Sequence, residues 1–250
     1  MPVESRKTEV GATAIEDAIR SNWEAVVERA GAAASRAGRD PQSVTIVAVT
    51  KTHPAEVVAA AVRAGITDLG ENYVQEMLEK QERVAGEVGP GAVRWHFIGH
   101  LQRNKAKYLA GRCHLVHSVD SAELAAELNR RAGKAGVRQA VLIEVNVAGE
   151  ASKFGVAPEA VVELASQVAG LEHLDLQGLM TVEPLAEDAE ACRPVFRRLR
   201  ELAEECVGAG LPPETMRHLS MGMTQDFEVA IEEGATIVRV GTAIFGPRRA

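Results

Sequence analysis

The chain has 250 residues, 46% of them hydrophobic, and its 28 basic against 35 acidic residues give a formal net charge of −7. It can therefore bury a full core, whereas interspersed charges of both signs offer no basic face and argue against nucleic acid as a partner. No apolar run approaches the 18 or so residues that span a bilayer, and residues 1–17 lack the apolar core of a signal peptide, so we expect a cytoplasmic protein without a membrane partner.

The N-terminal part of the chain predicts one helix ahead of the first strand. Residues 1–12 are polar and are expected to be disordered or frayed. A helical pattern follows over residues 13–37, with Thr13 and Glu16 as a capping box and Gly38 as the stop. We expect this extra helix to close the bottom of the barrel that the later strands predict.

The first strand is predicted over residues 44–49, an almost unbroken β-branched run that is typical of a strand buried on both faces of a parallel sheet. Lys51 follows this run, and Pro54 then opens a helix, so the lysine ammonium is expected in a loop at the strand's exit. A lysine near apolar walls loses its proton more easily, as Schiff-base chemistry with an aldehyde requires. On this segment alone, a solvated lysine at a strand end fits equally well.

Strand-like and helical segments alternate along the rest of the chain. Eight strands with their helices in about 210 residues fit a TIM (β/α)8 barrel, and no Gly-x-Gly-x-x-Gly follows the first strand to favour a Rossmann fold. We therefore expect a single α/β barrel domain over residues 13–250. Further strands are predicted over residues 66–71, 93–99, 115–119, 140–147, 174–182, 218–224 and 236–246. Helices are predicted over residues 54–64, from 71, over 104–110 and 122–132, from 158, and over 188–207 and 225–233.

Hydroxyl groups and glycines follow the last two predicted strands. Ser220 opens a Ser-Met-Gly-Met-Thr turn after the seventh, and Gly241 and Thr242 follow the eighth. The loops after strands seven and eight of a TIM barrel often hold a phosphate group, and Arg239 can face the barrel interior by alternation. Each feature alone also fits an ordinary turn or a salt-bridged arginine. Together with Lys51 they indicate a phosphorylated aldehyde bound as an imine, for which pyridoxal 5'-phosphate (PLP) is the obvious candidate.

The cysteines and histidines do not indicate a metal site. Cys113, Cys192 and Cys206 are far apart and form no CxxC pair, so we expect buried thiols rather than disulfides or zinc ligands. No HExxH motif is present, and His96 and His100 lie at a strand exit rather than on one helix face. Their roles stay open at this point.

Seven ordered segments resemble the motif series of the pyridoxal phosphate homeostasis protein family, whose members are similar to the barrel domain of alanine racemase and of fungal-type ornithine decarboxylase. The resemblance runs from about Val44 to Pro247. Arg103 and Thr224 stand where the family frequently has serine, and both are expected to lie outside the cofactor cradle. The segments are AVTKTHP, GENYVQE, WHFIGHLQRNK, LIEVNVAGEASKFG, LQGLMTV, LSMGMTQDFEVAI and VRVGTAIFG.

The resemblance implies a fold type III PLP-binding barrel in which PLP is covalently bound to Lys51. It also implies that Arg239 faces the pyridine nitrogen and that Asn72 and Met221 line the ring pocket. The residues implied to bind the phosphate are Ser220, Gly241 and Thr242.

The function implied by the resemblance is a protein that holds PLP as a Schiff base, regulates intracellular vitamin B6 homeostasis and supplies apo-enzymes. Its expected partners are PLP, related B6 vitamers and apo PLP-enzymes, and we expect a monomer. An arginine at the pyridine nitrogen weakens the ring as an electron sink. The chain stops four residues after Gly246 without the second domain of alanine racemase, and Tyr73 and Tyr108 are predicted to be helical.

Two enzymatic alternatives stay open. One is a PLP-dependent amino-acid racemase of the alanine racemase type, which needs a second base opposite Lys51. His96, His100 and His218 are the candidates for that base, but no neighbouring motif positions them. The other alternative is a cofactor-free Schiff-base aldolase. We assign no catalytic residue and expect a carrier rather than an enzyme with steady turnover.

Overall fold

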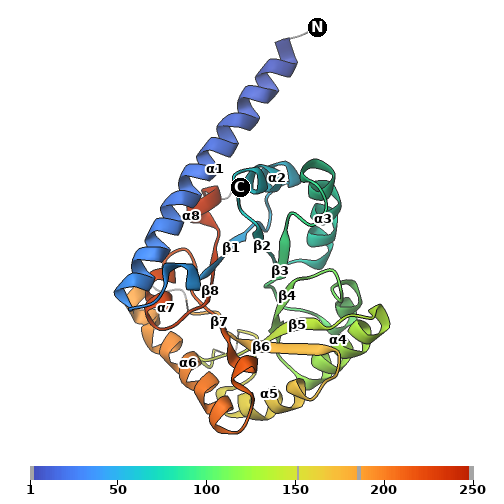
Figure 1. The fold of residues 1–250 in the computed structure, drawn as a ribbon, viewed down its shortest axis with the longest axis vertical. Helices are drawn as coiled ribbons and strands as arrows, with labels where there is room; N and C mark the ends of the chain where they lie inside the picture. The colour runs from blue at the N-terminus through green and yellow to red at the C-terminus, as the bar shows by residue number, and fades with distance from the viewer. Residues whose placement is uncertain (1–2, 151, 185–186, 248–250) are drawn as a thin grey trace.

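Eight parallel strands form a closed barrel in which β1 pairs with β2 on one side and with β8 on the other (Figure 1). The computed structural model describes residues 3–150, 152–184 and 187–247. The expected TIM (β/α)8 barrel is confirmed. The strands are β1 Thr45–Val49, β2 Asp68–Glu71, β3 Arg94–Phe97, β4 Leu115–Val119, β5 Gln139–Glu144, β6 Leu174–Met180, β7 His218–Ser220 and β8 Ile237–Val240.

The helices surround the barrel, as a view along its axis shows (Figure 1). The α-helices are α1 Val3–Arg36, α2 Ala55–Arg63, α3 Val74–Val88, α4 Ala122–Ala135, α5 Val161–Ala169, α6 Arg193–Gly208, α7 Phe227–Glu232 and α8 Thr242–Phe245. Short 3-10 helices are η1 Pro41–Ser43, η2 Arg103–Tyr108, η3 Pro158–Ala160, η4 Ala189–Cys192 and η5 Pro213–Met216.

The N-terminal helix α1 differs from its prediction in start and in place. It begins at Val3, so Thr13 lies inside the helix, and the capping-box interpretation is wrong. Glu16 instead accepts hydrogen bonds from Arg20 and Arg63, each at 3.0 Å. The helix packs against α2, α7 and α8 on the flank of the barrel rather than closing its bottom, because α8 has only four residues and leaves that flank to be covered (Figure 1).

Two further predicted elements differ in extent. The helix predicted over residues 104–110 is the 3-10 helix η2, Arg103–Tyr108. The last strand ends at Val240 rather than at residue 246, because Gly241 leaves the extended conformation (φ −116°, ψ −78°) and the chain turns into α8. This early ending places Gly241 at the N-cap of α8 and Thr242 at its first residue, at the rim of the barrel.

Burial follows the expected pattern for the thiols and the strands. Cys113, Cys192 and Cys206 are all buried, as predicted, and burial raises the pKa of the Cys113 thiol to about 12, which makes it a poor nucleophile. Within the described part of the chain, no helix is both long and apolar enough to cross a membrane.

Gly178 allows β6 and β7 to approach each other. Its φ of +151° is rarely adopted by other residues, and the pairing of β6 with β5 skips one residue just before it. A Cβ atom at this position would collide with the backbone carbonyl of His218 in β7. The glycine predicted inside this strand is therefore required by the barrel itself.

We predict that Gly178→Ala lowers the free energy of unfolding by about 3 kcal/mol or more, because both backbone strain and a backbone collision oppose the new side chain. Gly86→Ala in α3 is the matched control, since an added Cβ there meets no atom within 4 Å. The control should gain up to about 1 kcal/mol from helix propensity. Urea unfolding of both variants checks this, and equal stabilities would contradict it.

Candidate functional site

Lys51 lies two residues beyond β1, at the carboxyl end of the barrel where TIM-barrel sites form. Its side chain is half-buried, and the preceding Thr50 is fully buried. Asn72 directly follows β2 and is half-buried. Met221 directly follows β7 and is fully buried. The parallel barrel therefore brings these predicted residues to one end of the molecule.

The segment after β8 lies at the same end of the barrel, beside the last residue of β1. A Cβ atom at Gly241 would lie 3.5 Å from the Cβ of Val49, the last residue of β1. Thr242 is exposed at the same rim. The main-chain N–H of Gly241 donates a hydrogen bond to the Thr224 Oγ1 at 3.2 Å. Thr224, which was expected to lie outside the cradle, thus joins the segments after β7 and β8 through its hydroxyl.

Arg239 faces the barrel interior, as alternation along β8 predicted. It is 4% exposed, and its Nη1 donates to the Oγ of Ser220 at 2.8 Å. Its Nη2 donates to the carbonyl oxygen of Thr181 at 2.8 Å and lies 3.8 Å from a carboxylate oxygen of Glu183. The guanidinium is thus fixed on several sides beneath the loops that follow β6, β7 and β8.

A buried hydrogen-bonded chain continues from Arg239 across the barrel. Ser220 Oγ contacts His117 Nδ1 at 2.9 Å, His117 Nε2 contacts His96 Nδ1 at 2.9 Å, and His96 Nε2 contacts Asp68 Oδ1 at 3.1 Å. An arginine can only donate and a carboxylate only accepts, so with neutral rings each group donates toward Asp68. Burial lowers the pKa of His117 well below its ordinary value, which keeps that ring neutral.

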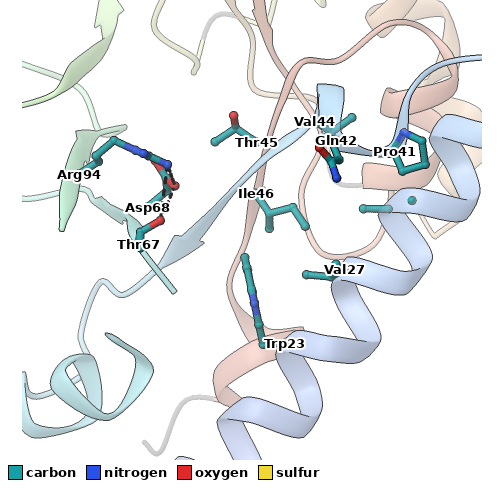
Figure 2. Close-up of a pocket in the computed structure, with 12 residues that line it drawn as sticks. Trp23, Val27, Pro41, Gln42, Val44, Thr45, Ile46, Thr67, Asp68 and Arg94 are labelled. Carbon is teal, nitrogen blue, oxygen red and sulfur yellow. Dashed lines mark hydrogen bonds and ion pairs between the residues drawn. The ribbon is translucent and has the colours of Figure 1, made fainter. Parts of the chain in front are cut away.

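The far end of this chain lies at the opposite face of the barrel. Arg94 donates to Asp68 there, and both residues line a cavity of about 350 Å³ between α1 and the first strands (Figure 2). Although burial opposes it, hydrogen bonds from His96 and Arg94 hold the pKa of Asp68 well below its ordinary value. Trp23 and Ile46 supply apolar surface to the same cavity (Figure 2). This cavity lies at the amino ends of the strands and is separate from the end that carries Lys51.

Comparisons with known proteins agree with this geometry. The family model described as alanine racemase, N-terminal domain, matches residues 16–249. A pyridoxal phosphate homeostasis protein of Aquifex aeolicus (strain VF5) is 47% identical over 227 residues, which cover 90% of this chain and 96% of the relative. The homeostasis protein of Pseudomonas aeruginosa is 46% identical over 231 residues, or 92% and 96% of the two chains.

The chain belongs to the pyridoxal phosphate homeostasis protein family. A solved structure supports the same placement: PipY of Synechococcus elongatus PCC7942 with PLP bound matches with a TM-score of 0.75 and 34% identity, covering 88% of this chain and all of that one. The resemblance seen in the seven sequence segments is thereby confirmed.

Two buried carboxyl groups at the carboxyl end of the barrel were not predicted from the sequence. Glu144 is the last residue of β5, and Glu183 follows β6 by three residues. One oxygen of Glu144 and both oxygens of Glu183 are buried without a hydrogen-bond partner. Burial raises the pKa of each to about 7, while the nearby Arg239 opposes the shift. Glu144 could have been found from the sequence, because it is an acidic residue at the end of a long apolar strand.

The structure places the three candidate histidines, whose roles the sequence left open, and Tyr73. His96 is buried in the barrel between Asp68 and His117, and His218 begins β7 at the amino end of that strand. Of the three candidate histidines, only His100 follows a strand on the side of Lys51; it stacks on Phe154 with ring centroids 3.6 Å apart. Tyr73 precedes α3 in an extended conformation, so its predicted helical state is wrong.

We predict that Glu144→Gln stabilises the protein increasingly as pH rises. A carboxyl whose folded pKa is about 7 and whose ordinary value is 4.5 favours folding below pH 4.5 and loses that contribution as pH rises through 7. The advantage of the variant should grow to the order of 3 kcal/mol above pH 7. Urea unfolding of both proteins between pH 4.5 and 8.5 measures it, and parallel pH profiles would contradict it.

Proposed function

We propose that this protein binds PLP as a Schiff base on Lys51 and holds it for supply to apo-enzymes, as part of vitamin B6 homeostasis. The observation that carries the proposal is the closeness of Gly241 to Val49, the last residue of β1. It brings Gly241 and the Thr224 hydroxyl to which Gly241 N–H donates beside the strand end that Lys51 follows. The names of the relatives and the PLP-bound PipY structure support the same ligand.

The polar groups around the proposed site suit such a ligand. Buried polar atoms in proteins normally have partners, yet Glu144 and Glu183 carry oxygens that bond to no protein group. The positive charge of the buried Arg239 acts on both carboxyl groups and opposes the rise in their pKa. A polar ligand at this end of the barrel would satisfy such atoms, whereas an apolar one would leave them unpaired.

We assign the chain's own groups as follows. Lys51 Nζ forms the covalent bond, with one water released as the C=N bond replaces the aldehyde C=O bond. The hydroxyls of Thr224 and Thr242 would hold the phosphate, and Gly241, whose N–H already donates to Thr224, would leave room for it. The Ser220 hydroxyl already bonds His117 and Arg239 inside the barrel, so we assign it to holding Arg239 rather than to the phosphate. Arg239 faces the pyridine nitrogen, and Asn72 and Met221 line the ring. When bound, PLP supplies a reactive aldehyde and a conjugated ring.

The geometry favours a carrier over a racemase. A racemase needs a second proton-transferring group opposite the lysine. His96 is engaged with Asp68 and His117, and His218 begins β7, at the amino end of that strand. His100 is engaged with Phe154 and, at 3.3 Å, with Asp120. The racemase alternative therefore lacks a positioned histidine among the three candidates.

Borohydride reduction of the PLP-loaded protein should fix the label on Lys51, because the end of β1, which Lys51 follows, lies beside Gly241. Peptide mapping locates the adduct, and absorbance follows the imine. Lys51→Ala should lose the imine band while keeping some phosphate-anchored PLP. An adduct on Lys153 in place of Lys51 would overturn the site.

The carrier proposal predicts transfer of bound PLP to an apo PLP-enzyme without steady turnover of L-alanine, other common L-amino acids or ornithine. Deuterium exchange at the amino-acid Cα detects racemisation, and recovery of apo-enzyme activity detects transfer. Exchange at about 1 to 1000 turnovers per second, the usual enzyme range, would restore the racemase alternative.

A further inference from the structure

A second lysine, Lys80 of α3, is buried directly behind the turn that carries Lys51. Its side chain is 6% exposed, and its Nζ donates to the Thr50 carbonyl oxygen and to Glu71 Oε1, each at 2.6 Å. It also donates to Glu76 Oε1 at 2.7 Å. All three N–H groups of the ammonium therefore have acceptors. A fully bonded ammonium has no lone pair to attack an aldehyde, so this lysine is not a second Schiff-base residue.

The same cluster holds the residues on both sides of Lys51. On one side, Thr50 receives the Lys80 bond at its carbonyl, and its Oγ1 donates to Glu71 Oε1 at 2.6 Å. On the other side, the main-chain N–H of Thr52 donates to Glu76 Oε1 at 2.6 Å. The backbone around Lys51 is thus fixed from α3 and from the end of β2.

Thr52 has a φ of +67° and is the one non-glycine residue with positive φ in the described ranges 3–150, 152–184 and 187–247. A β-branched residue in the left-handed region is strained, and such strain persists where surrounding contacts enforce it. The bond from Thr52 N–H to Glu76 is such a contact. Strain next to the proposed cofactor lysine, held by a buried ion-pair cluster, indicates a positioning role.

We propose that Lys80, with Glu71 and Glu76, positions Lys51 for imine formation by fixing the 50–52 turn. This inference rests on the proposed function, in which Lys51 holds PLP. Burying an ammonium is costly unless it is paired, and burial raises the pKa of Glu71 while Lys80 opposes the rise. The cluster orients the Lys51 side chain by fixing its backbone. It does not contribute to the proposed phosphate cradle, which lies beside β8, on the other side of β1.

Two probes separate positioning from general stability. PLP has the aldehyde and forms the imine, whereas pyridoxine 5'-phosphate has an alcohol in its place and tests ring and phosphate binding alone. In Lys80→Met, imine formation with PLP should fall roughly ten- to a hundredfold, the range for losing a hydrogen bond to a charged group. Affinity for pyridoxine 5'-phosphate should stay within about twofold of the parent, well below that range.

Glu76 supplies the variants that keep the test usable if Lys80→Met fails to fold, because Glu76 lies at the more exposed edge of the cluster. Glu76→Leu removes the acceptor for Thr52 N–H and should impair imine formation, whereas Glu76→Gln retains an oxygen acceptor and should rescue part of it. Adding Thr52→Gly to Glu76→Leu should also restore imine formation in part, since glycine adopts positive φ without strain.

The matched control is Arg83→Met, which removes another α3 cation whose ion pair with Glu56 is on the surface. It should behave as the parent with both probes. An equal fall in affinity for PLP and pyridoxine 5'-phosphate, or no change in imine formation, would overturn the positioning role. Failure of the proposed function is distinct: the parent and Lys51→Ala would then show the same absorbance with PLP.

Discussion

The pairing of β1 with β8 is the constraint on which the proposed site depends. Ala48 lies opposite Val240 in that register, so the next residues of the two strands leave the barrel side by side. The end of β1 is followed by Lys51, and the end of β8 is followed by Gly241 and Thr242. Residues separated by most of the chain become neighbours only because the eighth strand closes on the first. A barrel that failed to close would separate the lysine from its proposed phosphate cradle.

The interior of this barrel is organised by a buried arginine. TIM-barrel interiors are usually layers of branched apolar side chains, and here Val47, Leu142 and Ile237 belong to such a cluster. Arg239 interrupts it and requires acceptors, which Ser220 and the Thr181 carbonyl provide. The hydrogen-bonded chain that continues to Asp68 has donors at one end and a carboxylate at the other. With neutral rings, these two ends fix the direction of every bond, and the bonds to Ser220 and Thr181 hold the arginine.

The sequence predicted the strands well because β-branched runs and glycine stops are local signals. The lysine turn and the last two loops were also predictable, since parallel topology alone brings strand exits together. The start of α1 was missed because residues 3–12 contain no apolar stripe, although Pro2 stands directly before Val3 in the sequence. The Lys80 cluster and the His96–His117 contact could not be predicted, because they depend on side-chain register between elements. The hydrogen bond from Gly241 to Thr224 could not be predicted for the same reason.

The proposed cofactor site combines Lys51, a phosphate cradle and the buried Arg239. A crystal structure of the protein grown with PLP tests this arrangement most directly. Continuous density should join Lys51 Nζ to the aldehyde carbon, with the phosphate between the loops of Thr224 and Thr242 and the ring nitrogen toward Arg239. Density joined to another lysine, or a phosphate bound in the cavity beside Asp68 and Arg94, would contradict the account.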